Sequence, residues 1–346
     1  MKKTILAGMI AAISTSSFAA TELYKNDDTT VTFGGEVDAY LATMDIQGEK
    51  TDPDVNVWAK LQLNAEQKLS NKYTAFASFE VESGSWYDGT NNDATFDDVY
   101  VGVKTDTWGV AVGEVGDLAD SSDAIEKDDI TNEGNYMGGI GGHHKESSGH
   151  GIVAKAKLAD FTLVADMHTE SDENIDSLYG VSADYAINGL TVGAMYQAAE
   201  AEKLNDDGDR QYITDFQAFG ASVSYEIAGF YAAMTYTQFE GVDGFGFFSS
   251  QELVDGQSLG LAASYSFDKA RVYSTYAMAD LDKLSHTGAA LNDGDVTNFV
   301  IGVDYELADN ILTFVEYQTG EADGEVTGDV AKQDGETVVA GVYYSF

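Results

Sequence analysis

Apolar residues occupy every second position at the C-terminal end of the chain. These positions are Val338, Ala340, Val342, Tyr344 and Phe346, and the positions between them hold Val339, Gly341, Tyr343 and Ser345. A period of two places the two sets on opposite faces of a β-strand. This end of the chain is therefore predicted to be a strand with two chemically different faces.

The same pattern repeats upstream at a nearly constant interval. Tyrosines that end an alternating stretch fall at Tyr185, Tyr225, Tyr265, Tyr305 and Tyr344, a period of 40 with one slip of a single residue. A propeller blade would need four strands in each period, whereas each period here holds two alternating stretches of about ten residues. One period is therefore predicted to be a hairpin.

Alternating segments run from end to end of the chain and predict sixteen strands. They lie near 31–41, 55–69, 72–82, 96–104, 107–114, 150–158, 161–169, 177–187, 189–198, 216–227, 229–239, 257–267, 269–279, 296–307, 310–319 and 336–346. Seven connections are short, and they alternate with eight long ones: 42–54, 83–95, 115–149, 170–176, 199–215, 240–256, 280–295 and 320–335. Short turns at one rim and long loops at the other are typical of an all-β, antiparallel transmembrane β-barrel of the bacterial outer membrane.

The two faces of each strand indicate what surrounds the barrel. In the second strand Leu61 and Leu63 share a face with four further apolar residues, whereas Lys60, Gln62 and Glu66 lie on the other. The polar face is too charged to be a packed core, and sixteen strands enclose an aqueous channel. The apolar face is then expected to meet lipid, with all backbone groups paired around a closed ring.

The N-terminus and the overall charge add a compartment and exclude one class of partner. Lys2 and Lys3 precede an apolar run and a small-residue site, so residues 1–19 are predicted to be a secretory signal peptide and 20–346 the barrel. Its removal would take the formal charge from −41 to −43. A charge this negative argues against nucleic acid as a partner. The chain contains no cysteine, which excludes disulfide scaffolds and thiolate metal sites.

With these features the sequence resembles the general diffusion porins of Gram-negative outer membranes. The resemblance rests on residues 22–27, the connection 115–149 and the terminal segment 342–346. It implies a homotrimer, a long third loop folded into the lumen, and assembly by the barrel-assembly machinery guided by Tyr344 and Phe346. Two departures are the missing Pro-Glu-Phe-Gly turn of the third loop and the missing wall arginines, since the chain has only Arg210 and Arg271.

The connection 115–149 is the strongest candidate for the functional site, because loops of this length without a strand pattern are usually functional. Its acids could simply form a solvated surface loop, or they could line a pore constriction, which the resemblance favours. The candidate constriction residues are Asp117, Asp120, Asp123, Glu126, Asp128, Asp129 and Glu133. The facing wall is predicted from strand parity to carry Lys60, Tyr100, Lys155 and Lys157. Rings of acids favour cations, so the predicted channel prefers them.

Other clusters are weaker candidates. His143, His144 and His150 could bind a transition metal, but their glycine-rich context offers no rigid geometry, and no metal site or cofactor is expected. The acidic external loops could bridge to lipopolysaccharide through divalent cations, besides the contact of the wall with outer-membrane lipid. The inward aromatic residues Tyr40, Trp58, Phe76 and Tyr100 could form a sugar-stacking track or could be ordinary lumen lining.

Three functions remain open from the sequence. The favoured one is a passive, cation-preferring outer-membrane porin for small hydrophilic solutes. The alternative is a substrate-specific channel for oligosaccharides. An enzyme would need a nucleophile and a base within hydrogen-bond reach. His168 is the one histidine placed within a strand, and no partner with suitable spacing accompanies it, so catalysis is not expected.

Overall fold

The structure is a computed structural model that describes most of the barrel. The described residues are 20–46, 48–84, 94–116, 118–134, 151–171, 176–200, 215–242, 253–285, 288–292, 294–324 and 332–346. The predicted signal peptide, residues 1–19, lies outside them. Among the described residues, no helix is both long and apolar enough to cross a membrane.

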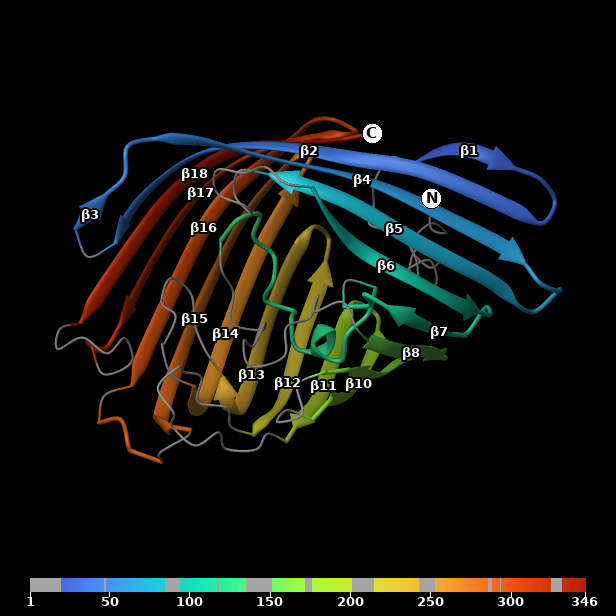
Figure 1. The fold of residues 1–346 in the computed structure, drawn as a ribbon. Helices are drawn as coiled ribbons and strands as arrows, with labels where there is room; N and C mark the ends of the chain where they lie inside the picture. Colours follow the sequence, from blue (N-terminus) through green and yellow to red (C-terminus); the bar gives the residue numbers. More distant parts are fainter. Residues whose placement is uncertain are drawn as a thin grey trace.

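Sixteen long antiparallel strands form a closed barrel, as predicted (Figure 1). They are β2 (Thr29–Ile46), β4 (Asp54–Lys68), β5 (Thr74–Gly84), β6 (Thr95–Lys104), β7 (Trp108–Gly113), β8 (Gly151–Leu158), β9 (Phe161–His168), β10 (Leu178–Ile187), β11 (Leu190–Ala199), β12 (Phe216–Ile227), β13 (Phe230–Val242), β14 (Val254–Phe267), β15 (Ala270–Leu284), β16 (Asp295–Ala308), β17 (Ile311–Ala322) and β18 (Gln333–Ser345). The short strands β1 (Thr21–Lys25) and β3 (Glu49–Lys50) pair with β2.

The barrel closes where the last long strand meets the first. β18 pairs with β2 from Gly335 opposite Ile46 to Ser345 opposite Glu36. Beyond this ladder, Phe346 and Gly35 exchange two backbone hydrogen bonds of 2.9 and 3.0 Å. β1 then pairs with the remaining part of β2, from Thr30 to Phe33. The wall is thus continuous along the whole of β2.

Short turns join the strands in pairs at one rim. The β10–β11 turn has positive φ at Asn188 and Gly189, and the β12–β13 turn has positive φ at Ala228 and Gly229. Two successive left-handed residues form the tight hairpin turn whose twist matches the flanking strands. The strands run on at the opposite rim: β2 reaches Ile46 and β17 reaches Ala322, beyond the predicted ends at 41 and 319. At this rim the backbone hydrogen bonds between strands continue, although apolar and polar residues no longer alternate regularly.

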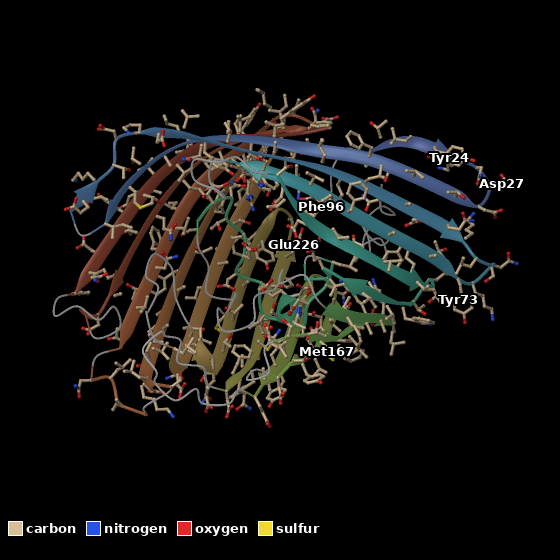
Figure 2. The ribbon with its side chains drawn as sticks, in the orientation of Figure 1. Tyr24, Asp27, Tyr73, Phe96, Met167 and Glu226 are labelled. Carbon is tan, nitrogen blue, oxygen red and sulfur yellow. The ribbon has the colours of Figure 1, made fainter. Side chains whose placement is uncertain are left out.

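The two faces of the wall differ as predicted. Leu61 is 47% exposed on the outer face of β4, whereas the neighbouring Gln62, inside the barrel, is 3% exposed. The repeated tyrosines stand just before the short turns, where Tyr225 pairs with Leu190 and Tyr305 with Ala270. Figure 2 shows Tyr24, Asp27 and Tyr73 at the same rim. An outward aromatic girdle at this level is typical of the membrane interface.

Candidate pore constriction

The third loop turns into the barrel directly after β7. Gly113 takes a φ of +131°, and the side chain of Glu114 accepts a hydrogen bond from the backbone of Val99 (3.0 Å). The loop then buries three apolar residues against inward residues of β5 to β9. This cluster comprises Val115, Leu118 and Ala119 of the loop with Phe76, Tyr100, Ala111, Val153 and Val164 of the wall. Apolar inward positions on these strands therefore anchor the root of the loop.

Asp120 fixes the loop next to the wall of β9 and β11. One carboxylate oxygen, Oδ2, lies 2.8 Å from Nε2 of His168. The other, Oδ1, accepts hydrogen bonds from the backbone N–H of Ser122 (2.7 Å) and from Gln197 (2.8 Å). Burial alone would raise the pKa of Asp120, but the hydrogen bonds from His168 and Ser122 hold it below its usual value. This carboxylate is therefore a charged anchor.

The middle of the loop lies on β11 to β14 (Figure 1). Ala124 and Ile125 are completely buried in an apolar cluster that includes Met195 and Phe216. Hydroxyl groups of the wall hold the loop backbone and one acid: Ser222 donates to the carbonyl oxygen of Ala124, Tyr231 to that of Lys127 (2.6 Å), and Thr235 to Asp128 (3.1 Å).

Glycines in the wall make this close approach possible. A Cβ atom on Gly193 would lie 2.2 Å from the carbonyl oxygen of Ala124, and one on Gly260 would lie 1.9 Å from the carboxylate of Asp128. Both distances are far below van der Waals contact. The inner wall is therefore recessed where the loop passes.

Glu316 of β17 holds the next part of the loop. Its two carboxylate oxygens accept hydrogen bonds from three successive backbone N–H groups, those of Asn132 (2.6 Å), Glu133 (2.7 Å) and Gly134 (2.9 Å). Tyr273 also donates to Glu316 (2.7 Å). On β18, the hydroxyl of Tyr343 donates to the carboxylate of Glu133. Burial raises the pKa of Glu133 while this hydrogen bond opposes the rise. The described part of the loop thus contacts inward residues on strands from β5 around to β18.

The predicted constriction acids divide into two groups. Asp120, Asp128 and Glu133 bind the wall and anchor the loop, whereas Asp123 and Glu126 are half-buried and Asp129 is exposed. Asp117 lies outside the described residues. Burial raises the pKa of Asp123 to about 6, although the neighbouring Lys155 and Lys127 counteract part of this effect.

The predicted wall residues lie in different environments. Lys60 forms an ion pair with Glu80 (3.3 Å) and stands over the ring of Trp58. Tyr100 is buried beneath the root of the loop, where it contacts Phe76 edge-on. Lys155 lies close enough to Asp123 to influence its charge, and Lys157 is half-buried near the end of β8 that carries a short turn.

Several bases inside the barrel are paired with carboxylates. Lys104 pairs with Glu66 (2.5 Å), Lys127 with Asp184 (3.2 Å), and Arg271 with Asp304 (2.7 Å from Nε). Further acids line the inner face of β2, β5 and β6. They are Glu36, Asp38, Glu80, Glu82, Asp97 and Asp98. Among the described residues, the interior therefore carries more acids than bases.

The rule that alternate residues of a strand face the lumen predicted most inward residues correctly. It did not predict that Asp97 points inward or which wall residues hold the loop. Counting back from Tyr100 by twos puts Asp98 inside and Asp97 outside, yet a β-bulge between the β5–β6 pairs turns both inward. Asp98 has a φ of +51° in this bulge. The sequence did not reveal that the wall glycines and Glu316 contact the third loop, because these contacts depend on which strands the loop crosses.

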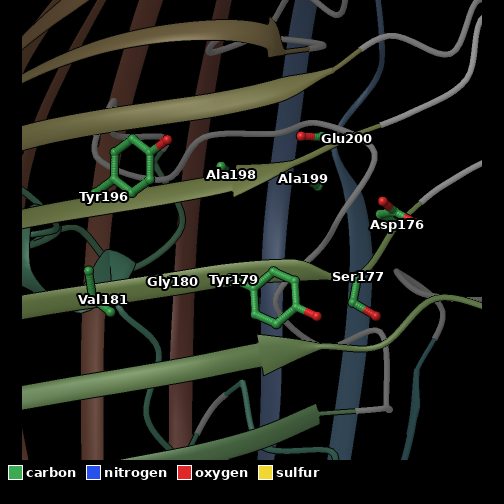
Figure 3. Close-up of a pocket in the computed structure, with 9 residues that line it drawn as sticks. All are labelled: Asp176, Ser177, Tyr179, Gly180, Val181, Tyr196, Ala198, Ala199 and Glu200. Atoms are coloured by element: carbon green, nitrogen blue, oxygen red, sulfur yellow. The ribbon is translucent and has the colours of Figure 1, made fainter.

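The remaining candidates of the sequence lie elsewhere or are covered. His143, His144 and His150 fall outside the described residues. Of the four aromatic residues considered as a sugar track, Tyr40, Phe76 and Tyr100 are buried. A cavity of about 470 Å³ is present on β10 and β11, near Tyr179, Tyr196 and the acids Asp176 and Glu200 (Figure 3). Tyr179 and Tyr196 are on the outer face, so this cavity does not belong to the pore.

Comparisons with known proteins agree with this architecture. The family described as Gram-negative porin matches residues 6–325. The chain belongs to the Gram-negative porin family. This porin is an outer-membrane diffusion channel of Gram-negative bacteria.

Two relatives and one solved structure illustrate the relationship. The porin is 26% identical to the "Porin-like protein L" of Photobacterium profundum and 22% identical to a "Monosaccharide porin" of Halomonas sp., each over the full length of both chains. The trimer form of OmpT, an outer membrane protein of Vibrio cholerae, superposes with a TM-score of 0.68 at 18% identity. That match covers 92% of this chain and 100% of OmpT.

Proposed function

We propose that this porin forms a passive, water-filled channel that prefers cations and passes small hydrophilic solutes. The observation that supports this most directly is the charge balance of the lumen. Carboxylates pair with Lys60, Lys104, Lys127 and Arg271, and Asp97, Asp98 and Asp129 add further acids to the described part of the interior.

The electrostatic energy between a lumen carboxylate and a passing ion is large enough to select between cations and anions. One unpaired charge ~4 Å from an ion contributes ~4 kcal/mol at an effective dielectric near 20, before screening. Screening at physiological salt acts over a Debye length of ~8 Å. An ion that passes between the third loop and the facing wall stays within the field of both, so the preference should weaken as salt rises.

Neutralising the half-buried and exposed loop acids tests the proposal and leaves the anchors Asp120, Asp128 and Glu133 in place. The variant Asp123→Asn/Glu126→Gln/Asp129→Asn should shift the reversal potential in a KCl gradient toward zero, because three lumen charges are lost. Glu321→Gln is the matched control, since Glu321 is exposed beyond the pore and pairs with Lys332. Anion preference in the wild type, or an unchanged reversal potential in the triple variant, would refute the proposal.

A channel specific for sugars is the second candidate, because one relative is named a monosaccharide porin. Trp58 is the aromatic residue of the proposed track that is only half-buried, and its indole N–H donates to Glu82 (3.1 Å). The same recordings with added monosaccharides discriminate the two functions: brief blocks of the current would favour a specific site, and their absence would favour a general porin.

We further propose that the porin is a homotrimer, which the trimer form of OmpT supports by likeness of fold. The loop 83–95, with Trp86 and Tyr87, is a candidate contact with a neighbouring barrel, and most of it lies outside the described residues. Protein extracted in mild detergent should sediment as a trimer, because part of each outer wall would be covered by a neighbour. Sedimentation as a monomer under the same conditions would refute the trimer. Outer-membrane lipid, lipopolysaccharide and the barrel-assembly machinery are the further partners that this assignment implies.

A further inference from the structure

Three carboxylates gather on the inner face of β5 and β6. Glu80 and Glu82 point inward from β5, and Asp97 joins them from β6 because of the bulge described above. One oxygen of each side chain lies within 4.8 Å of the others. Two oxygens that bind the same Ca²⁺ at ~2.4 Å can be at most ~4.8 Å apart, so the spacing fits a single cation.

Glu80 brings to this cluster a buried carboxylate oxygen without a hydrogen-bond partner among the described residues. Its side chain is only 2% exposed, and its Oε1 is 3.3 Å from the ammonium group of Lys60. Its second oxygen, Oε2, is buried and accepts no hydrogen bond from any residue that the structure describes. A buried carboxylate oxygen without a partner is costly, and a cation in the cluster would satisfy it.

The surroundings hold the cluster in place and leave it negative. The indole of Trp58 orients Glu82 through its N–H, and the backbone N–H of Asp98 donates to Asp97 (2.9 Å). Lys60 also stands 5.1 Å from the centre of the Trp58 ring, a contact that keeps its ammonium group at the edge of the cluster. Three carboxylates and one ammonium group leave two negative charges, which a divalent ion balances.

We propose that Glu80, Glu82 and Asp97 form a binding site for a hard divalent cation, with Ca²⁺ as the best fit. Carboxylate oxygens are the ligands that Ca²⁺ prefers, and three such groups supply up to six of its usual ~6–8 ligands. Asp97 is half-buried and gives the ion a path from the lumen. The three carboxylates all belong to the strands β5 and β6 of the wall. The site does not depend on the proposed ion preference.

Binding of Ca²⁺ to the folded barrel in detergent tests the site. The double variant Glu80→Gln/Glu82→Gln should bind one Ca²⁺ fewer per chain, or bind it at least about tenfold more weakly, since even changes outside the ligand shell cost about 10- to 100-fold. Glu66→Gln is the matched control, because Glu66 also faces the lumen and pairs with a lysine. Asp97→Asn is a second variant, which changes a half-buried side chain and disturbs folding least; it should weaken binding as well.

A local probe separates this site from acidic loops that also attract Ca²⁺. Tb³⁺ replaces Ca²⁺ and is excited through a nearby tryptophan, so Trp58 should sensitise its luminescence in the wild type and in Glu66→Gln. The signal should be lost in Glu80→Gln/Glu82→Gln and should be displaced by Ca²⁺. Equal Ca²⁺ binding in all variants, or no sensitised luminescence in the wild type, would overturn the proposal. Neither result would affect the reversal potential measured in KCl without calcium, which tests the proposed function separately.

Discussion

The charge of the loop residue Asp123 is expected to change between pH 8 and pH 5. Burial raises its pKa to about 6, so it is ionised well above pH 6 and neutral well below it. The lumen should therefore lose one negative charge as the pH falls through this value. Cation selectivity, measured as the reversal potential at pH 8 and pH 5, should decrease toward the lower pH.

Asp123→Asn removes the group that titrates and provides the control for this pH effect. In this variant the reversal potential should already be lower at pH 8 and should change less on acidification. If the wild type and Asp123→Asn respond to pH identically, Asp123 does not contribute to the field along the ion path.

Individual side chains also mark the limit of what could be predicted from the sequence. Alternation placed Lys60 inside the barrel correctly, because the strand period leaves only two choices. It did not distinguish an acid that faces water, such as Asp129, from acids that bind the wall, such as Asp120 and Asp128. That difference depends on contacts with strands far away in the sequence.

At the scale of elements, the third loop is held by a small number of strong contacts. Glu316→Gln replaces one acceptor oxygen with an NH₂ group that faces the backbone donors of residues 132–134. Hydrogen bonds to a charged group contribute about 1.5–3 kcal/mol each, so this end of the loop should be released. The open-channel current of this variant should fluctuate more than that of the wild type in single-channel recordings.

Glu321→Gln, on the same strand β17, is the control for this effect because its carboxylate contacts no part of the loop that the structure describes and pairs with Lys332. Equal current noise in the two variants would show that Glu316 does not restrain the loop.

The strands themselves were largely predictable, and the path of the loop was not. Sixteen alternating segments and seven short turns follow from local pattern, which is why their number and order agree with the structure. The third loop has no period. Its path depends on recesses at Gly193 and Gly260 and on apolar contacts such as Ile125 with the wall, and these arise only after the barrel has closed.

Closure of the barrel is a property of the whole molecule, and substitutions of the last residue, Phe346, test it. Phe346 exchanges backbone hydrogen bonds with Gly35, and its ring lies near those of Phe33 (6.5 Å) and Tyr344 (5.9 Å). Phe346→Asp loses these ring contacts and puts a charge at the seam, so the yield of folded, heat-modifiable barrel should fall while export continues. Phe346→Tyr keeps the aromatic contacts and should fold normally. A normal yield from Phe346→Asp would exclude a role of this residue in assembly.

The seam between β2 and β18 also determines when the molecule can fold. Glu36 and Ser345, which meet there through a hydrogen bond of 2.8 Å, are 309 positions apart in the chain. Until the last strand is available, the sheet has two open edges whose backbone groups find no partner in hydrocarbon. Contacts between residues so far apart in the sequence slow folding. They also prolong the time for which unpaired strand edges can aggregate. We therefore expect a nascent chain of this porin to gain little from folding strand by strand, because the ring can close only when the last strand is present.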